Sequence, residues 1–416
     1  MKKYLIAVTM VLIILIMLTG CKNTKTTSSL DDIGTSQEVE SSSKQDDASE
    51  DKVTTSTSVS SDTSSAESKP TVSTPSVSKP TENVEKYSKN NVEFIGRFVD
   101  SERGKRFDWS GSTITAGFIG TKASVKLYAT ARNTDGKDYF NVIIDGNEPF
   151  VLTVTPEQSE YVLASNLKNG HHTIKLIKRT EAQFGMLIEF AGFVFKGGKP
   201  APAPARKDFL IEIYGDSISA GYGNEGKGSG FRLKEENASL TYGMLAAEAL
   251  NAEASVIACS GYGMALSLGG ENAKVLPDYY NKNLFHVSGS SISRVKASPK
   301  LIVINLGTND FAMNIDTGRF YSEYLSFVKK LKAKNPDANI VLMVGGGTTR
   351  HIEILERVVQ VIKISDSNAK VGVFVSTLDL FSDPDFLGAD GHPTVKAHKI
   401  LANELVEYVR TNCDLG

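Results

Sequence analysis

This chain of 416 residues has a low net charge and few cysteines. The formal net charge is -2, so the charge balance does not favour a nucleic acid or an anionic membrane surface as a partner. Of the three cysteines, Cys21 lies near the N-terminus, which leaves Cys259 and Cys413 for at most one disulfide. Because Cys259 ends an apolar run, we expect a buried free thiol there rather than half of a disulfide.

Large apolar residues are rare between residues 22 and 88, where Ser, Thr, Lys, Asp, Glu and Pro dominate. Such a composition cannot bury enough apolar surface to offset the entropy of ordering the chain. This excludes a packed domain and predicts a disordered tether. A flexible coil of about sixty residues has an end-to-end distance of roughly 45 Å, enough to hold a domain clear of a surface.

Residues 1–21 have the pattern of a targeting signal, with Lys2 and Lys3 followed by an apolar stretch. The last four residues, Leu18-Thr19-Gly20-Cys21, resemble the lipobox of bacterial lipoproteins. That resemblance implies cleavage before Cys21, lipidation of its thiol, and a protein outside the cytoplasm whose only membrane contact is the lipid anchor. An ordinary secretory signal or an uncleaved N-terminal anchor is the alternative.

Apolar and polar residues alternate between residues 89 and 198, and no helical repeat is found there. Segments such as 124–129 and 173–176 show the period of two that is typical of half-buried strands. Asp145-Gly146 follows one such segment and is a hairpin turn signal. We therefore predict an antiparallel β-sandwich, followed by a stiff Pro- and Ala-rich linker over residues 199–206.

Between residues 207 and 416, nearly continuous apolar runs alternate with amphipathic segments. The amphipathic segments place apolar residues three or four apart, as at Phe320, Tyr324 and Val328. This alternation predicts a parallel sheet covered by helices on both faces, with a five-stranded flavodoxin-like order as the expected topology. The predicted strands are 209–214, 254–259, 300–306, 339–344 and 371–375.

Two of the segments that follow apolar runs carry a possible nucleophile and base. Gly215-Asp216-Ser217 follows the first predicted strand, and a glycine there allows a sharp turn that exposes the serine hydroxyl. A serine hydroxyl needs a base to take its proton, and His392 lies just before the last predicted helix. Ser217 is the candidate nucleophile and His392 the candidate general base. The alternative is a turn serine that only caps a helix.

Two further segments offer donors for a developing negative charge. Asn309 follows the third predicted strand, where its side-chain amide can donate to an oxyanion. Gly261 follows the second predicted strand, and its backbone N–H is a candidate donor beside that of Ser217. Asn309 could equally be a turn residue, and Gly261 could serve only close packing. Taken together, these residues meet at the carboxyl edge of the sheet, where open α/β folds bind their ligands.

The same residues resemble the four sequence blocks of the SGNH (GDSL-like) hydrolases, which are Gly215-Asp216-Ser217, Gly261, Gly307-Thr308-Asn309-Asp310 and His392. A longer match, over residues 215–226, 236–237, 242–243 and 305–310, is similar to carbohydrate esterase family two. The resemblance implies a jelly-roll sandwich before an SGNH domain, and deacetylation of plant polysaccharides such as xylan or glucomannan without a metal or cofactor. It also implies that Ser217 is the nucleophile, that His392 is the base, and that Ser217 N–H, Gly261 N–H and Asn309 form the oxyanion hole.

The residue that would orient His392 is left open by the sequence. Many SGNH enzymes have an aspartate three residues before the histidine, where this chain has Ala389. Asp390 matches the aspartate of family two, and it could hold the imidazole or only shape the loop, with a backbone carbonyl orienting the ring. The sequence is also compatible with two other functions. One is deacetylation of another ester, such as O-acetylated peptidoglycan or an exopolysaccharide, and the other is non-catalytic glycan binding.

Overall fold

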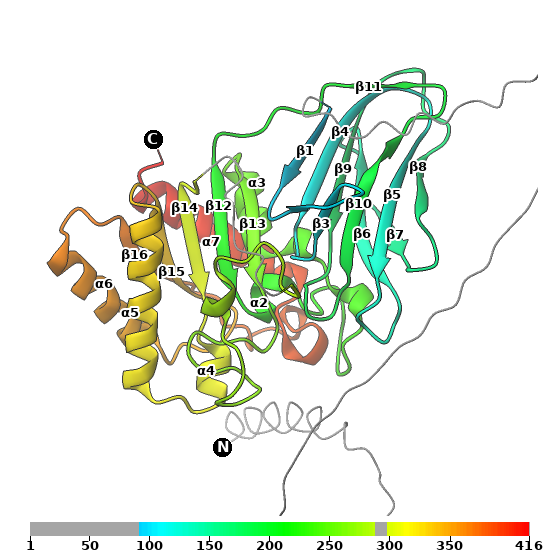
Figure 1. Cartoon of the computed structure of the whole chain (residues 1–416). Coiled ribbons are helices and arrows are strands. Elements are labelled where there is room, and N and C mark those ends of the chain that lie inside the picture. Colours follow the sequence, from blue (N-terminus) through cyan, green and yellow to red (C-terminus); the bar gives the residue numbers. More distant parts are fainter. Residues whose placement is uncertain (1–90, 288–297, 416) are drawn as a thin grey trace, which may run out of the picture. The chain divides into compact units, whose positions relative to one another are not determined.

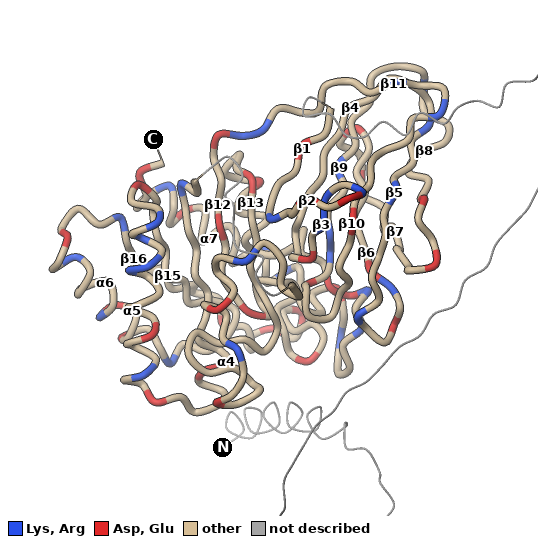
Figure 2. The backbone as a smooth tube through the Cα atoms, in the orientation of Figure 1, with Lys and Arg blue, Asp and Glu red and all other residues tan. Residues whose placement is uncertain are grey.

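The computed structural model describes residues 91–287 and 298–415, which contain a β-sandwich followed by an α/β domain (Figure 1). The predicted signal, the lipidation site Cys21 and the predicted tether lie outside the described residues. No helix among the described residues is long and apolar enough to cross a membrane. Lys and Arg are interspersed with Asp and Glu over both domains, as Figure 2 shows, in keeping with the low net charge.

The N-terminal domain consists of two antiparallel sheets packed face to face, with strand orders β1-β4-β9-β6-β7 and β2-β3-β10-β5-β8. The strands are β1 (Val92–Ile95), β2 (Val99–Asp100), β3 (Lys105–Phe107), β4 (Thr113–Gly120), β5 (Ala123–Thr130), β6 (Asp138–Ile144), β7 (Phe150–Val154), β8 (Glu160–Ala164), β9 (Gly170–Lys178), β10 (Leu187–Val194) and β11 (Lys199–Ala201). Side chains from both sheets, among them Phe107, Phe118 and Phe190, form one buried core. The predicted sandwich is confirmed.

The turn between β6 and β7 shows how the sequence determines this pairing. Asp145 and Gly146 both have positive φ angles, 54° and 72°. Two such residues in succession form the tight turn whose twist matches that of the flanking strands. The turn is closed by a hydrogen bond of 3.0 Å from Asn147 N–H to the Ile144 carbonyl.

The C-terminal domain is a five-stranded parallel sheet of order β13-β12-β14-β15-β16, the predicted flavodoxin-like order. Helices α5 and α6 pack on one face and α3 and α7 on the other (Figure 1). The strands are β12 (Leu210–Gly215), β13 (Glu253–Ala258), β14 (Leu301–Asn305), β15 (Asn339–Val344) and β16 (Val371–Val375). The helices are α2 (Ser217–Ala220), α3 (Tyr242–Ala249), α4 (Thr308–Ala312), α5 (Thr317–Lys334), α6 (Ile352–Ser365) and α7 (Val395–Asn412). Short 3-10 turns are η1 (Leu233–Glu235), η2 (Ala238–Leu240), η3 (Leu276–Tyr279), η4 (Pro384–Phe386) and η5 (Ala389–Gly391).

The segment between the two domains, predicted as a stiff Pro- and Ala-rich linker, begins with a short strand. Its first three residues form β11, which pairs with β4 of the sandwich. Arg206 then donates to the Glu253 carboxylate of the α/β domain and, at 2.8 Å, to the Phe94 carbonyl of the sandwich. The sequence suggested a stiff spacer because Pro and Ala dominate it, but an edge strand tolerates proline, which lacks an N–H donor.

No disulfide bond is found among the described residues. Cys259 and Cys413 are both free, and Cys259 is buried, as predicted from the apolar run that precedes it.

Candidate active site

Ser217 lies at the first position of α2, directly after β12 and a tight turn. A Cβ atom at Gly215 would come within 1.9 Å of Ser219 Oγ, so only glycine fits there. Asp216 caps the helix by accepting a hydrogen bond of 3.0 Å from the Ile218 N–H. The turn therefore holds Ser217 at the carboxyl end of the strand, with 8% of the residue exposed.

His392 is brought to Ser217 from the other end of the domain. Its Nε2 lies 2.9 Å from Ser217 Oγ, and its Nδ1 lies 3.2 Å from the Ala389 carbonyl oxygen. A carbonyl oxygen can only accept, so Nδ1 carries the ring proton and Nε2 is free to accept from the serine hydroxyl. The pair has the geometry of a nucleophile and its general base.

Burial lowers the pKa of the His392 imidazole, and the backbone carbonyls of Ala389 and Asp390, with the Asp390 charge, oppose this shift only in part. A lowered pKa keeps the imidazole neutral around pH 7, the form that can accept a proton. Its ring also lies against Tyr222, with the ring centroids 4.3 Å apart. Packing and hydrogen bonding to the backbone thus hold the base in place.

Among the described residues, no hydrogen bond joins the Asp390 carboxylate to His392, which favours the loop-shaping role, one of the two that the sequence left open for Asp390. Its carboxylate accepts from the Tyr222 hydroxyl at 3.0 Å and from the N–H groups of Gly230 and Phe231 at 2.8 and 3.1 Å. The physical reason is local: Asp390 has a left-handed backbone, with φ of 52°, within the turn that precedes His392. This carboxylate shapes the loop and fixes Tyr222, and the Ala389 carbonyl takes the orienting role instead.

Asp390→Asn should therefore leave kcat within roughly tenfold of wild type, whereas losing the carboxylate of a true triad costs about 10⁴. Asparagine tolerates the left-handed backbone and keeps one oxygen acceptor. Because the Asp390 charge raises the imidazole pKa, its removal should also shift the acid limb of the pH–rate profile to lower pH. Steady-state kinetics over a pH range measure both effects, and a 10⁴-fold loss of kcat would restore Asp390 to a triad.

Asn309 makes hydrogen bonds to the neighbours of the other two predicted oxyanion donors. Asn309 Nδ2 donates to the Tyr262 carbonyl at 2.9 Å, next to Gly261, and makes a longer contact of 3.4 Å with Asp216 Oδ2, next to Ser217. Among the described residues, no hydrogen-bond partner is found for the N–H of Ser217 or of Gly261. Gly261 adopts φ of 80°, which other residues rarely do. The arrangement leaves two backbone donors free for an oxyanion, beside an amide with one weakly engaged hydrogen.

Asn309→Ala should lower kcat by roughly 10²–10³ with little change in KM, as loss of one oxyanion donor does elsewhere. The substrate carbonyl in the ground state needs the donor less than the tetrahedral intermediate, so the loss falls on kcat. Hydrolysis of 4-nitrophenyl acetate by the folded variant measures it. A loss below about tenfold would make Asn309 a turn residue only.

Asp310 is a contributor that the sequence interpretation did not single out. It is fully buried, and its carboxylate accepts from the N–H groups of Met264, Ala265 and Leu266 at 2.7 to 2.8 Å. It thereby fixes the loop that follows Gly261. The signal in the sequence was its position next to Asn309 in Gly-Thr-Asn-Asp. A carboxylate that is buried there needs several hydrogen-bond donors.

Trp109, Tyr279 and His398 are buried and structural. Trp109 is 1% exposed and packs edge-on against Tyr279 and Phe285, so it belongs to a core and not to a sugar platform. Tyr279 is buried in the same cluster. His398 is buried, and its Nδ1 accepts from the Tyr242 N–H, so it is a core histidine.

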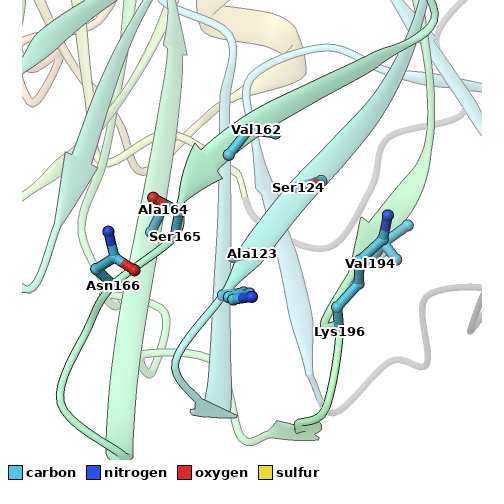
Figure 3. Close-up of a pocket in the computed structure, with 9 residues that line it drawn as sticks. Ala123, Ser124, Val162, Ala164, Ser165, Asn166, Val194 and Lys196 are labelled. Atoms are coloured by element: carbon cyan, nitrogen blue, oxygen red, sulfur yellow. The ribbon is translucent and has the colours of Figure 1, made fainter.

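A surface hollow of the sandwich, shown in Figure 3, contains none of the predicted site residues. It is lined by Lys122, Ala123, Ser124, Val162, Ala164, Ser165, Asn166, Val194 and Lys196, a set without an aromatic side chain.

Comparisons with known proteins identify both domains. Residues 94–204 match the family model described as carbohydrate esterase 2 N-terminal, and residues 213–400 match the GDSL-like lipase/acylhydrolase family. A solved family two carbohydrate esterase from Clostridium thermocellum, in complex with cellohexaose, is 33% identical, with a TM-score of 0.71 over 77% of this chain and 98% of that chain.

Two curated proteins are similar as well. The cellulase/esterase CelE of Acetivibrio thermocellus is 33% identical over 77% of this chain, which spans only 39% of that protein. An acetylxylan esterase / glucomannan deacetylase of Cellvibrio japonicus is 26% identical over 78% of this chain and 89% of its own length. The geometry of the site and these matches show that the chain belongs to carbohydrate esterase family two.

Proposed function

We propose that this protein is a serine esterase that removes O-acetyl groups from plant cell-wall polysaccharides of the xylan or glucomannan type. The observation that carries the proposal is the 2.9 Å contact between Ser217 Oγ and His392 Nε2, beside two free backbone N–H donors. The acetylated-polymer substrate is supported by the name of the Cellvibrio japonicus relative, an acetylxylan esterase / glucomannan deacetylase.

Acylation follows from the roles of these groups. Ser217 Oγ attacks the acetyl carbonyl carbon while His392 Nε2 takes the hydroxyl proton. The carbonyl oxygen becomes an oxyanion, which the N–H groups of Ser217 and Gly261 and the Asn309 amide stabilise. The intermediate then collapses: the bond to the sugar oxygen breaks, His392 returns the proton to that oxygen, and an acetyl-enzyme remains.

Deacylation repeats the sequence with water. Water attacks the acetyl carbonyl carbon, and His392 accepts its proton. The second intermediate breaks the bond to Ser217 Oγ, which takes the proton back, and acetate leaves. The imidazolium formed in each half is stabilised by the Ala389 carbonyl at Nδ1, a weaker partner for a cation than a carboxylate.

We also propose that the enzyme works outside the cytoplasm, held to the bacterial cell membrane by lipid on Cys21. The lipobox-like sequence supports this. A location at the cell wall favours a second candidate substrate, O-acetylated peptidoglycan or another acetylated glycan of the envelope. Globomycin-sensitive processing and detergent-phase partitioning that are lost in Cys21→Ala would support the anchor, and unchanged partitioning would contradict it.

Acetate release tests the function and ranks the substrates. The wild-type protein is incubated with acetylated xylan, acetylated glucomannan and O-acetylated peptidoglycan, with Ser217→Ala as the control for background hydrolysis. We expect Ser217-dependent release that is fastest from xylan or glucomannan. Fastest release from peptidoglycan would favour the second candidate. No release from any polymer or from 4-nitrophenyl acetate would leave a non-catalytic glycan-binding protein.

A further inference from the structure

A buried carboxylate of the sandwich domain contacts the loop that contains Gly261. Glu181 follows β9, has 0% of its surface exposed, and accepts from the Ser260 N–H at 2.7 Å. Its second oxygen accepts from the Ser260 hydroxyl. Ser260 directly precedes Gly261, so a residue of one domain holds the neighbour of an oxyanion donor of the other.

The hydrogen bonds between Glu181 and Ser260 restrain the direction of the Gly261 N–H. That N–H belongs to the peptide between Ser260 and Gly261, and a glycine with φ of 80° restrains it little by itself. Beyond Gly261 the loop is held by Asp310, and at Tyr262 it is held by Asn309. On the other side of Gly261, Glu181 is the side chain that holds Ser260.

Glu181 is itself held firmly. Its own N–H donates to Glu236 Oε2 of the α/β domain at 3.1 Å, and its carbonyl accepts from Gly185 N–H at 3.0 Å. Nearby, Lys178 Nζ forms a buried ion pair with Asp138 at 3.1 Å and donates to the Thr180 carbonyl at 2.9 Å. A rigid support is needed for a side chain that is to fix a neighbour to within a fraction of an ångström.

We propose that Glu181 is a positioning residue of the oxyanion hole, acting through Ser260 on the Gly261 N–H, so that the sandwich contributes one residue to the support of that hole. The inference rests on the proposed esterase function and deepens it. Misplacing a catalytic group by about 1 Å can cost roughly 10²-fold in rate. Loss of the Glu181 carboxylate should therefore reduce transition-state stabilisation and leave ground-state binding nearly unchanged.

The chain offers a matched control in Asp108. This carboxylate also belongs to the sandwich, is also 0% exposed, and also accepts from backbone N–H groups of the α/β domain, at Phe285 and His286. It differs from Glu181 in that its partners do not flank an oxyanion donor. A purely structural role would make the two variants alike.

The test compares Glu181→Ala, Glu181→Gln and Asp108→Ala on 4-nitrophenyl acetate. We expect Glu181→Ala to lower kcat by roughly 10²-fold with KM within about threefold, and Asp108→Ala to lower Tm without a comparable loss of kcat. Glutamine can accept from Ser260 N–H and donate to Ser260 Oγ, so Glu181→Gln should recover most of the activity. If the alanine variant does not fold, Glu181→Asp, whose carboxylate is drawn back by one methylene, takes its place.

A second substrate, the thionoester O-(4-nitrophenyl) thionoacetate, isolates the contribution of the oxyanion hole. Its sulfur accepts hydrogen bonds weakly, so its hydrolysis depends less on the oxyanion donors. If Glu181 positions a donor, Glu181→Ala should lose much more rate on the oxygen ester than on the thionoester. Equal losses on the two esters, or a kcat loss matched by Asp108→Ala, would overturn the inference while leaving the esterase intact. A wild-type protein without Ser217-dependent hydrolysis would overturn both.

Discussion

Ser217→Ala should lower kcat for acetate release by on the order of 10⁶, the size of the loss when a serine nucleophile is removed elsewhere. The variant has no atom that can form the acetyl-enzyme, and the remaining oxyanion donors can only assist direct attack by water. Ser217 Oγ contacts His392, and removing it leaves the helix cap at Asp216 in place. We therefore expect Tm to stay close to wild type.

Ser219→Ala is the matched control, since Ser219 lies two residues further along α2 and its Oγ bonds to the Tyr242 hydroxyl at 2.7 Å. It should retain kcat within roughly tenfold, as a change outside the reacting groups does. Release of 4-nitrophenol and of acetate measures both variants. Substantial Ser217→Ala activity, with the protein pure and folded, would mean that another group performs the attack.

His392→Ala should reduce kcat by a comparable factor, on the order of 10⁵–10⁶, because nucleophile and base act as one unit. The pH profile gives a second readout. Wild-type kcat/KM should be flat at neutral pH and fall as pH drops through the imidazole pKa, since the protonated ring cannot accept a proton. Burial lowers that pKa, so the fall should occur below the ordinary histidine value of about 6.5.

His392→Ala should lack the acid limb of the pH–rate profile, and its residual rate should rise with hydroxide concentration instead. His171→Ala is the control, because His171 is exposed on β9 of the sandwich and should leave both rate and profile unchanged. An acid limb that persists in His392→Ala would assign the titration to another group. A limb centred above pH 6.5 would contradict the effect of burial.

The fold and the reacting pair could be predicted because the relevant signals are local. Long apolar runs mark strands buried on both faces, and Ser217 and Asn309 follow such runs directly. The carboxyl ends of parallel strands share one edge, so residues there meet even when far apart in sequence. His392 could be placed because proline and helical spacing follow it.

The direction of the Asp390 side chain could not be predicted, because it depends on one backbone angle. With φ of 52°, Asp390 turns its carboxylate to Tyr222 and the Gly230–Phe231 segment, and not to the histidine two residues later. No pattern of residue types encodes that choice. Sequence spacing alone therefore could not separate a triad from a pair oriented by a carbonyl.

Glu181 could not be found for a different reason. Its partner Ser260 is 79 residues away and in another domain, so the contact exists only after both domains have folded and docked. A glutamate after a strand ordinarily predicts a solvated loop. The pairing of Lys199–Ala201 with β4 could not be predicted for a similar reason, since it depends on a free strand edge that the segment itself does not reveal.

The most direct test of the central claim is covalent labelling by a fluorophosphonate, followed by peptide mapping with mass spectrometry. An activated serine displaces fluoride and keeps the phosphonyl group, so the label does not turn over as an acetyl group does. We predict labelling of Ser217 with one equivalent of reagent, and no comparable labelling in His392→Ala. A wild-type protein that stays unlabelled, or is labelled at another residue, would contradict the account of Ser217 as a nucleophile activated by His392.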